Sequence, residues 1–403
     1  MGKTARAIDG VPAIEFAQQN SGRLKIIEYD ATLTIHMPDG RFRLAVEDDM
    51  ADNGNTPGKR RPRYRGTHPR RYEERYKELR ARDYPGITEH IRAQGRTPAG
   101  THIPVMLDTV MERLAPKPGE IVIDCTLGYG GHARYFARRI GSTGRLIALD
   151  ADAAQLEITA SQMEEEGISI SVYPRNFEAL DSVTRDAGVP GANIIFADLG
   201  LSSMQIDDPN RGFSYKCDGP LDMRMDQRQI QTAAELLRRT TSEELIRALT
   251  DLGDEPAAQA ISEAIIARQT NNPLTRTWEL ADLIFRAKGL TRRAWQQQRD
   301  DTDLHPAART FQAIRMLVNR ETTALSRLLK ALPRILLPGG RVGILTFHSG
   351  EDRLVKQYLR DALRGGVFDA AAIDPDRPSP AEVAANPRSR PAKFRWAILA
   401  ANS

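Results

Sequence analysis

Glycines and an acidic residue follow two short apolar runs in the middle of the chain. The stretch IVIDCTLGYGGHARYF at 121–136 places Gly128, Gly130 and Gly131 just after the first run. Glycines there let the backbone approach a ligand closely, and a following helix offers its free N–H groups. The second run ends in Asp150, 22 residues after Gly128, where a carboxylate can accept hydrogen bonds from both ribose hydroxyls. The pattern predicts a nucleoside cofactor.

The spacing of these glycines separates two classes of cofactor. The Gly-x-Gly-Gly-His pattern lacks the third glycine of the Gly-x-Gly-x-x-Gly fingerprint, which counts against a pyrophosphate ligand and an NAD-dependent oxidoreductase. S-adenosylmethionine fits better, because its amino-acid end needs hydrogen-bond partners and no phosphate cradle. Phe177 lies after the third apolar run, where it can pack on adenine or belong to the core. The alternative is that the glycines only form tight turns and Asp150 only caps a helix.

Asp198 ends a fourth apolar run, at the edge where ligands meet substrate in open α/β sheets. Methyl transfer from a sulfonium needs a positioned nucleophile, and an amine nucleophile needs an acceptor for its N–H. Asp198 is the candidate acceptor, with binding of the cofactor's ammonium as an equal alternative. His348 is the candidate for taking the proton, with a structural role at a strand end as the alternative. Methylation of a ring carbon would need a cysteine nucleophile, and neither Cys125 nor Cys217 has a suitable context.

Apolar runs that alternate with helical segments predict the elements that hold these residues. The runs lie at 121–123, 146–149, 168–172, 194–196 and 342–347. Strands alternating with helices indicate a doubly wound parallel sheet, which binds ligands at the carboxyl ends of its strands. About 145 residues separate the last two runs, and three segments among them have helical spacing. We therefore expect an α/β domain at 101–232 and 305–403, interrupted by a helical insert at 233–304.

Residues 1–100 differ in pattern from the rest of the chain. Alternating apolar and polar residues at 23–48, on either side of Pro-Asp-Gly, predict a β-hairpin within an extension at 1–56. The linker at 57–100 is basic: eleven Lys or Arg and three Asp or Glu between Pro57 and Arg82 give a local charge of +8. Such a stretch is either a tether for a polyanion or a solvated linker. At the other end, 370–391 is Pro/Ala-rich and reads as irregular, and KFRWAILAAN predicts a last strand.

The composition excludes several classes of protein. The 403 residues are 40% hydrophobic and 27% charged, as is usual for a soluble globular protein. No stretch approaches the roughly 20 apolar residues of a membrane span, and the N-terminus lacks a signal-peptide pattern. Two cysteines supply neither a disulfide framework nor a zinc site, so no metal site is expected. We expect a cytoplasmic protein without a membrane partner, and the sequence is compatible with a homodimer.

Five blocks of the sequence resemble a known enzyme family. They are TLGYGGH (126–132), DLGLSSMQIDDPNRGFSYKCDGPLDMRMD (198–226), HPAARTFQAIRMLVNRE (305–321), LPGGRVGILTFHSGEDRLVK (337–356) and NPRSRPAKFR (386–395). Together they resemble the RsmH or MraW family, which methylates cytosine N4 in the decoding region of small-subunit (16S) ribosomal RNA. The resemblance covers about 101–403 and leaves 1–100 as an extension outside the family pattern. Tyr129, Met204 and Gly350 depart from the family's basic residue, proline and leucine.

The resemblance implies a class I, Rossmann-like, S-adenosylmethionine-dependent methyltransferase sheet with a helical insert for substrate recognition. Its partner would be small-subunit ribosomal RNA or the assembled subunit. The cofactor-binding positions that carry over are Gly130, Gly131 and His132 in the loop, Asp150 at the ribose, Phe177 near adenine, and Asp198 and Gln205 beside the methionine end. The alternative to an enzyme is a ribosome-assembly factor that keeps a remnant cofactor site.

Binding of RNA would need further residues near Asp198, because the target base must leave its stack to reach the sheet edge. Phe213 and Tyr215 are the candidates for stacking on bases, and Arg211 and Arg224 for contacting phosphates. A second candidate surface lies in the insert, at Arg292, Arg293 and Arg299. A solvated charged face is the alternative for that second surface.

Overall fold

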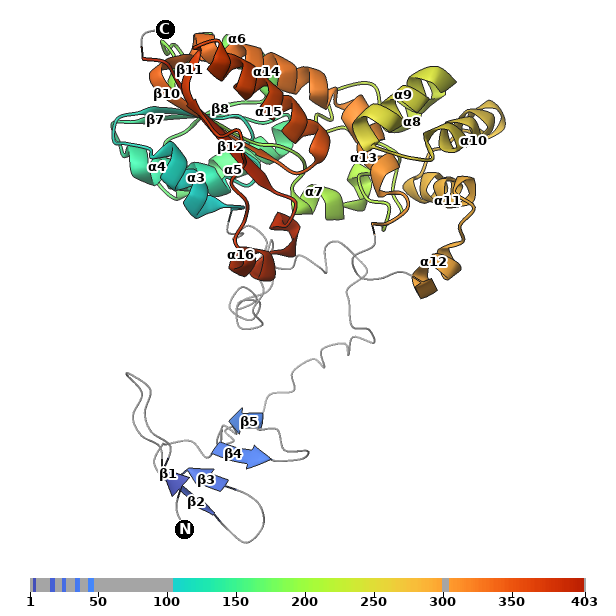
Figure 1. Ribbon diagram of the computed structural model, residues 1–403, viewed down its shortest axis with the longest axis horizontal. Coiled ribbons are helices and arrows are strands. Elements are labelled where there is room, and N and C mark those ends of the chain that lie inside the picture. The colour runs from blue at the N-terminus through green and yellow to red at the C-terminus, as the bar shows by residue number, and fades with distance from the viewer. Residues whose placement is uncertain are drawn as a thin grey trace, which may run out of the picture. The chain divides into compact units, whose positions relative to one another are not determined.

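A computed structural model describes residues 104–298 and 304–401, the side chains of 203, 204 and 298 excepted, together with the backbone of five short N-terminal strands (Figure 1). The predicted basic linker and Arg299 lie outside the described residues. The chain divides into two units, Met1–Thr67 and His68–Ser403. Each unit is described by itself.

The first unit contains an antiparallel sheet whose strands follow one another in chain order. The strands are β1 (Lys3–Thr4), β2 (Glu15–Gln18), β3 (Leu24–Ile26), β4 (Leu33–His36) and β5 (Arg43–Val46). β4 and β5 pair with Leu33 opposite Val46 and His36 opposite Arg43. This pair flanks the Pro-Asp-Gly sequence where the alternating pattern predicts the hairpin turn.

The second unit is built on a seven-stranded sheet in the order β11-β12-β10-β9-β6-β7-β8. Its strands are β6 (Ile121–Asp124), β7 (Arg145–Leu149), β8 (Ser171–Tyr173), β9 (Ala192–Asp198), β10 (Leu336–Thr346), β11 (Phe368–Ala371) and β12 (Lys393–Leu399). β6 to β10 pair in parallel, whereas β12 is antiparallel to both of its neighbours. The order reverses between β6 and β9, and such a switch point leaves a crevice at the carboxyl ends of the strands.

Helices cover both faces of this sheet (Figure 1). α3 (Leu107–Leu114), α4 (Gly131–Ile140) and α5 (Ala153–Glu165) pack on one face, and α6 (Leu180–Asp186), α14 (Glu321–Ile335) and α15 (Ser349–Arg364) on the other. Successive strand residues point to opposite faces. Val122 and Ile194 accordingly belong to the first core, and their neighbours Ile123 and Ile195 to the second. The predicted α/β class with a doubly wound sheet is confirmed.

A third hydrophobic core lies among the helices beside the sheet (Figure 1). These helices are α8 (Ala233–Arg239), α9 (Ser242–Gly253), α10 (Ala258–Asn271), α11 (Thr277–Ala287) and α13 (Ala308–Val318). The short helix α12 (Arg292–Gln298) contacts α11 through the rings of Trp295 and Phe285. α8 begins at the predicted border of the insert, but the core also takes in Phe213 and Met223 before it and Phe311 on α13 after it. The helical region is therefore packed together with both segments that connect it to the sheet.

Two local expectations need correction. The third strand is β8 at Ser171–Tyr173 and not 168–172, because Ile168 and Ile170 pack against the core ahead of the strand. The tail is also more regular than predicted. It holds the end of β11, the helix α16 (Pro380–Ala385), capped by the Ser379 side chain, and a 3-10 turn at Pro387–Ser389. The last strand, β12, forms where KFRWAILAAN predicts it.

Candidate functional site

The glycine loop between β6 and α4 is held by hydrogen bonds between its backbone and side chains of neighbouring elements. Gly128 donates its N–H to Asp150 Oδ2 at 2.8 Å, and its carbonyl accepts from Thr159 Oγ1 at 2.6 Å. Gly128 and Gly130 have φ values of 50° and 70°, a region that favours glycine. A Cβ on Gly130 would meet Thr159 Cγ2 at 2.9 Å, whereas one on Gly128 would enter open space. The loop is thus packed on one side and open on the other, as a ligand-binding loop requires.

Asp150 keeps acceptor capacity for a ligand. Oδ2 accepts from Gly128, and Oδ1 accepts from the N–H of Asp152 at 2.8 Å. Each oxygen retains a lone pair, so two adjacent ribose hydroxyls can donate to this carboxylate. Burial raises the pKa of Asp150 to about 6, although the two backbone N–H groups oppose the shift. Phe177 follows β8 and is half-buried against the core.

Two carboxyl groups lie at the adjoining ends of β6 and β9. Asp198 donates its N–H to Thr126 Oγ1 at 2.7 Å, and Thr126 donates its own N–H to Asp124 Oδ1 at 3.0 Å. Burial raises the pKa of Asp124 to about 7, and the charge of Asp150 adds to the shift. Burial also raises the pKa of Asp198 to about 7, assisted by the charges of Asp124 and Glu351. The side chain of Asp198 keeps 30% of its surface exposed, so it can meet a substrate.

His132 is a neutral neighbour of Asp198. Its Nε2 lies 3.0 Å from the carbonyl of Val105, which places the ring proton on Nε2. The unprotonated Nδ1 then faces Asp198 Oδ2 at 3.9 Å. Burial lowers the pKa of His132 to about 4, so the ring carries no charge at neutral pH. Gly131 lies against Pro104, where a Cβ would come within 2.8 Å of Cγ.

Gln205 reaches the site from α7 (Ser203–Asp207), which follows β9. Its Oε1 accepts from the N–H of Ser202 and its Nε2 donates to Asp152 Oδ2, both at 3.1 Å. The structure thus brings all the expected cofactor residues to one edge of the sheet. It also adds Thr126, Thr159 and Asp152, whose hydrogen bonds have no signature in the sequence beyond their closeness to the glycine loop and Asp150.

His348 is the N-cap of α15. Its Nδ1 accepts from the N–H of Glu351 at 3.4 Å, and its Nε2 lies 3.0 Å from Glu351 Oε1. The other oxygen of Glu351 accepts from the N–H of Phe347 at 3.2 Å. Both ring nitrogens therefore face Glu351, so the structural alternative describes His348 better.

The four residues expected to contact RNA point into the protein. Phe213 is 7% exposed and belongs to the third core, and Tyr215 stacks on His305 with 4.2 Å between ring centroids. Arg211 forms an ion pair with Asp152. Arg224 donates to Asp222 through both Nε and Nη2, at 2.7 Å each, and to backbone carbonyls. These contacts use the ring faces and guanidinium groups inside the protein, which does not favour the expected contacts with RNA.

The insert surface is only partly available to a ligand. Arg293 is exposed, whereas Arg292 lies 3.8 Å from Asp282, donates to the carbonyl of Trp278 and lies over the Phe285 ring. Arg299, the third member, lies outside the described residues. We therefore give this surface no further role.

The open space beside two glycines and the charge of the site suit S-adenosylmethionine. Gly128 and Gly200, with φ values of 50° and 107°, both border space where a Cβ would meet nothing closer than 3.9 Å. Carboxyl groups at Asp124, Asp150 and Asp198 suit a cofactor that carries a sulfonium and an ammonium. Among the residues that the structure describes, no group of His, Cys, Asp and Glu is arranged to hold a metal ion, and no helix is long and apolar enough to cross a membrane.

Comparison with known proteins gives a consistent result. The model of the MraW methylase family matches residues 99–399. Ribosomal RNA small subunit methyltransferase H 1 of Lachnoclostridium phytofermentans is 41% identical over 353 residues, covering 87% of this chain and 95% of the relative. Ribosomal RNA small subunit methyltransferase H of Symbiobacterium thermophilum is 40% identical over 312 residues, covering 74% and 96%. The first match is longer than 99–399 and therefore includes residues before 99.

Among solved structures, a SAM-dependent O-methyltransferase of Thermotoga maritima aligns with a TM-score of 0.34 and 11% identity. The alignment covers 78% of this chain and 72% of that one. A likeness at this level adds nothing to the family match. The assignment of the chain to a family depends on the family model and on the relatives at about 40% identity.

The raised pKa of Asp198 predicts a stability cost that depends on pH. Between about pH 4 and 7 the folded protein keeps a proton that the unfolded chain releases, so the free energy of unfolding falls as pH rises through this window. Asp198→Asn should remove the cost. In thermal or urea unfolding without cofactor, the variant should exceed wild type in stability by about 1 kcal/mol or more at pH 8, with a much smaller gain at pH 4.5.

The matched control is Asp251→Asn, which makes the same chemical change at an exposed position on α9. The difference between this variant and wild type in free energy of unfolding should be the same at both pH values. A gain for Asp198→Asn that is equal at both pH values would show that the Asp198 carboxyl is not strained by burial.

Proposed function

Because the chain belongs to the MraW methylase family, we propose that it transfers a methyl group from S-adenosylmethionine to N4 of a cytosine in the decoding region of small-subunit ribosomal RNA. S-adenosylmethionine is its methyl donor. The family match over 99–399 carries the proposal, and the relatives named as small-subunit ribosomal RNA methyltransferases support its choice of substrate. We place the reaction in the cytoplasm, where such RNA is found.

The acceptor nitrogen needs help from the protein. The lone pair of cytosine N4 is delocalised into the ring, so the amine is a weak nucleophile. When bound, the cofactor supplies a methyl group on a positively charged sulfur. A carboxylate that accepts a hydrogen bond from the N4 amine holds its lone pair toward the methyl and stabilises the positive charge that develops on nitrogen. Asp198 lies at the end of β9 with 30% of its side-chain surface exposed, which supports this role.

The proton balance also favours Asp198. As the new N–C bond forms, the nitrogen must lose one proton, and sulfur keeps the electrons of the broken S–C bond. An acceptor with a pKa near 7 is well matched to this step at neutral pH. His132 faces Asp198 with an unprotonated nitrogen and so adds no competing positive charge. Asp198 therefore both orients the amine and takes its proton in this proposal.

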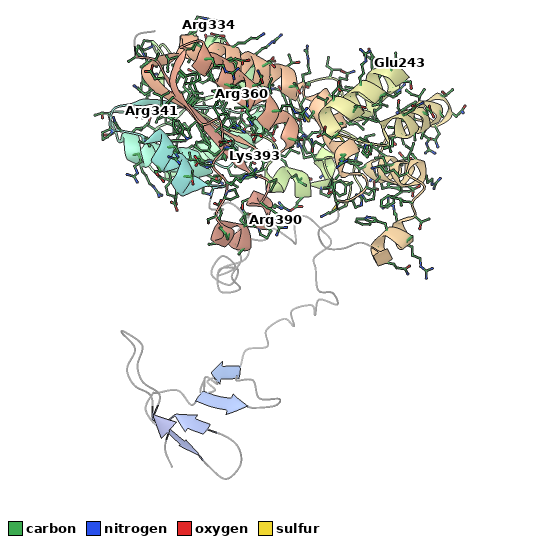
Figure 2. The ribbon with its side chains drawn as sticks, viewed as in Figure 1. Glu243, Arg334, Arg341, Arg360, Arg390 and Lys393 are labelled. Atoms are coloured by element: carbon green, nitrogen blue, oxygen red, sulfur yellow. The ribbon has the colours of Figure 1, made fainter. Side chains whose placement is uncertain are left out.

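Phosphate contacts would come from a row of basic side chains on α15. The α15 basic row consists of Arg353, Lys356, Arg360 and Arg364, of which Arg360 is labelled in Figure 2. At 100° per residue these positions lie within about 80° of the helix circumference, over a length of about 16 Å. Within the described part of the chain, none of the four side chains has an ion-pair or hydrogen-bond partner. Asp361, paired with Gln357, is the acidic side chain beside the row.

The position of the α15 basic row suits an RNA strand that leaves the site. α15 begins at Ser349, immediately after the loop that connects it to β10, and β10 pairs with Asp198 through Leu345. The row therefore starts near the carboxyl edge of the sheet and runs away from it. Evenly spaced basic side chains can neutralise successive phosphates without reading sequence. The alternative, a solvated helix face, predicts no effect of these residues on RNA affinity.

The first experiment tests the reaction itself. Purified protein with S-adenosylmethionine and unmodified small subunits should yield N4-methylcytidine, detected by mass spectrometry of the digested RNA. Asp198→Ala should lower kcat at least a hundredfold or abolish transfer, because it removes the acceptor for the N4 proton. Asp251→Ala on α9 is the control and should match wild type.

Two outcomes of this experiment would change the proposal. If Asp198→Ala transfers methyl groups at nearly the wild-type rate, Asp198 is not the acceptor of the N4 proton. A large loss of S-adenosylhomocysteine affinity in that variant would instead place Asp198 on the cofactor's ammonium. S-adenosylhomocysteine should raise the melting temperature of the wild type where NAD does not, which separates the methyltransferase from an oxidoreductase. Cofactor binding without product on any small-subunit substrate would favour the non-catalytic assembly factor.

The second experiment tests the α15 basic row. Lys356→Glu/Arg360→Glu should weaken binding to small subunits at least tenfold and reduce the slope of log K against log salt by about 1.4, the value for two phosphates on a single strand. Arg138→Glu/Arg139→Glu makes the same charge change on exposed residues of α4, on the opposite face of the sheet. If both double variants lose the same affinity for small subunits, the binding depends only on the net charge of the protein and not on the α15 basic row.

The third experiment concerns the basic segment before the described domain. Deletion of residues 1–97 should lower RNA affinity and reduce its salt dependence, because the local charge of +8 would be lost. Binding is measured against salt for the full chain and the deletion variant. An unchanged slope would assign this segment to the role of a solvated linker.

A further inference from the structure

Asp152 lies in the loop between β7 and α5 and is only 4% exposed. Its Oδ1 caps α5 by accepting from the N–H of Gln155. Its Oδ2 accepts two side-chain hydrogen bonds, from Gln205 Nε2 at 3.1 Å and from Arg211 Nη1. A buried carboxylate with a bonded arginine and amide is held in one orientation, and it holds both partners in turn.

The cofactor side of this cluster is direct. Asp152 donates its N–H to Asp150 Oδ1 at 2.8 Å, so it helps to orient the carboxylate that faces the ribose. Gln205, the other partner, is the residue that the family resemblance assigns to the methionine end of the cofactor. The loop at 150–152 therefore carries Asp150 and also bonds to Gln205.

The opposite side of the cluster reaches the helical region. Arg211 Nη2 donates to the carbonyls of Arg224 and Met225, at 3.1 and 2.9 Å. The N–H of Met225 donates to Asn319 Oδ1 at 2.7 Å, and Asn319 Nδ2 donates to the carbonyl of Met223 at 2.8 Å. Asn319 is the C-cap of α13, which packs in the third core. A continuous set of hydrogen bonds thus connects Asp150 with the helices next to the site.

We propose that Asp152 is a positioning residue that couples cofactor binding to the ordering of the acceptor-side segment, residues 203–226. This rests on the proposed function, because that segment follows Asp198, where the target amine would bind. A cofactor that fixes Asp150 and Gln205 also fixes the Asp152 carboxylate between them, and Arg211 transmits this order to Arg224 and Met225. By linkage, an ordered segment should in turn bind the cofactor more tightly.

Arg211 depends strongly on Asp152. Its side chain is 12% exposed, its Nε has no partner within the described residues, and its Nη2 donates only to carbonyls. Asp152 is therefore the group that neutralises this buried guanidinium. Removing one member of such a pair leaves an uncompensated buried charge. Arg211 would then move, and the carbonyls of Arg224 and Met225 would lose their donor.

A matched pair elsewhere in the protein separates positioning from stability. Glu120 and Arg341 are 12% and 14% exposed and share two side-chain hydrogen bonds, at 2.7 and 2.8 Å. Glu120 precedes β6, so this pair lies at the amino end of the strand, away from the site. Glu120→Gln should lower the melting temperature through the loss of a buried ion pair, with no effect on cofactor or RNA binding.

The test compares Asp152→Asn with Glu120→Gln by hydrogen exchange, with and without S-adenosylhomocysteine. In wild type the ligand should slow exchange in 203–226. Asp152→Asn keeps an acceptor for Gln155 but loses the charge, so it should abolish this protection. It should also weaken S-adenosylhomocysteine binding three- to tenfold and lower kcat/KM for the small subunit at least tenfold. Glu120→Gln should keep the protection and stay within twofold of wild type in both binding and kinetics.

Any of three results would overturn the coupling. The first is that S-adenosylhomocysteine still slows exchange in 203–226 of Asp152→Asn, and the second is that it fails to do so in wild type. The third such result is that Glu120→Gln loses this slowing to the same extent as Asp152→Asn. If Asp152→Asn does not fold, Arg211→Lys replaces it, because an ammonium cannot bond Asp152 and both carbonyls through a planar fork. That variant should show the same loss, and retained protection would again overturn the coupling. The exchange measurement needs no RNA, so it stands apart from a failure to methylate the proposed substrate.

Discussion

Burial of carboxyl groups at the switch point of the sheet is the constraint on which the site depends. Asp124 and Asp198 end neighbouring strands, and burial raises the pKa of each to about 7. Two such groups are costly to ionise in the empty protein. A cofactor with a sulfonium and an ammonium offsets that cost, and its product, which has lost the sulfonium charge, offsets less of it.

The loops around this centre hold their shape through bonds to one another. Gly128 contacts Asp150 and Thr159 through its own N–H and carbonyl, so the glycine loop is fixed by residues from the next strand and helix. Through Asp150, Asp152 connects that loop to Arg211. The glycine loop and Asp150 are in place before any ligand arrives, whereas the segment that Arg211 holds is the part that we propose the cofactor orders.

Much of this could be predicted from the sequence, and the limits are physical. Apolar runs followed by Asp124, Asp150 and Asp198 predicted the ends of β6, β7 and β9 to within one residue, because burial follows from the apolar pattern. Side-chain partners do not follow from it. His348 has the residue type of a proton acceptor, yet its position at the start of α15 makes it a cap. Whether a polar side chain is free or bonded depends on residues that are distant in the chain, as Asp152 and Arg211 are.

The same reasoning explains why RNA must be held away from the acidic centre. An RNA strand would bring phosphates toward the carboxyl groups of Asp124, Asp150 and Asp198. Arg211 and Arg224 already neutralise internal carboxylates. Charges act over about 8 Å at physiological salt. Attraction for the backbone must then come from outside this range, while a flipped base, which carries no charge, crosses it alone. In the proposed function the α15 basic row supplies this attraction, because it begins one turn into α15 and extends about 16 Å from there.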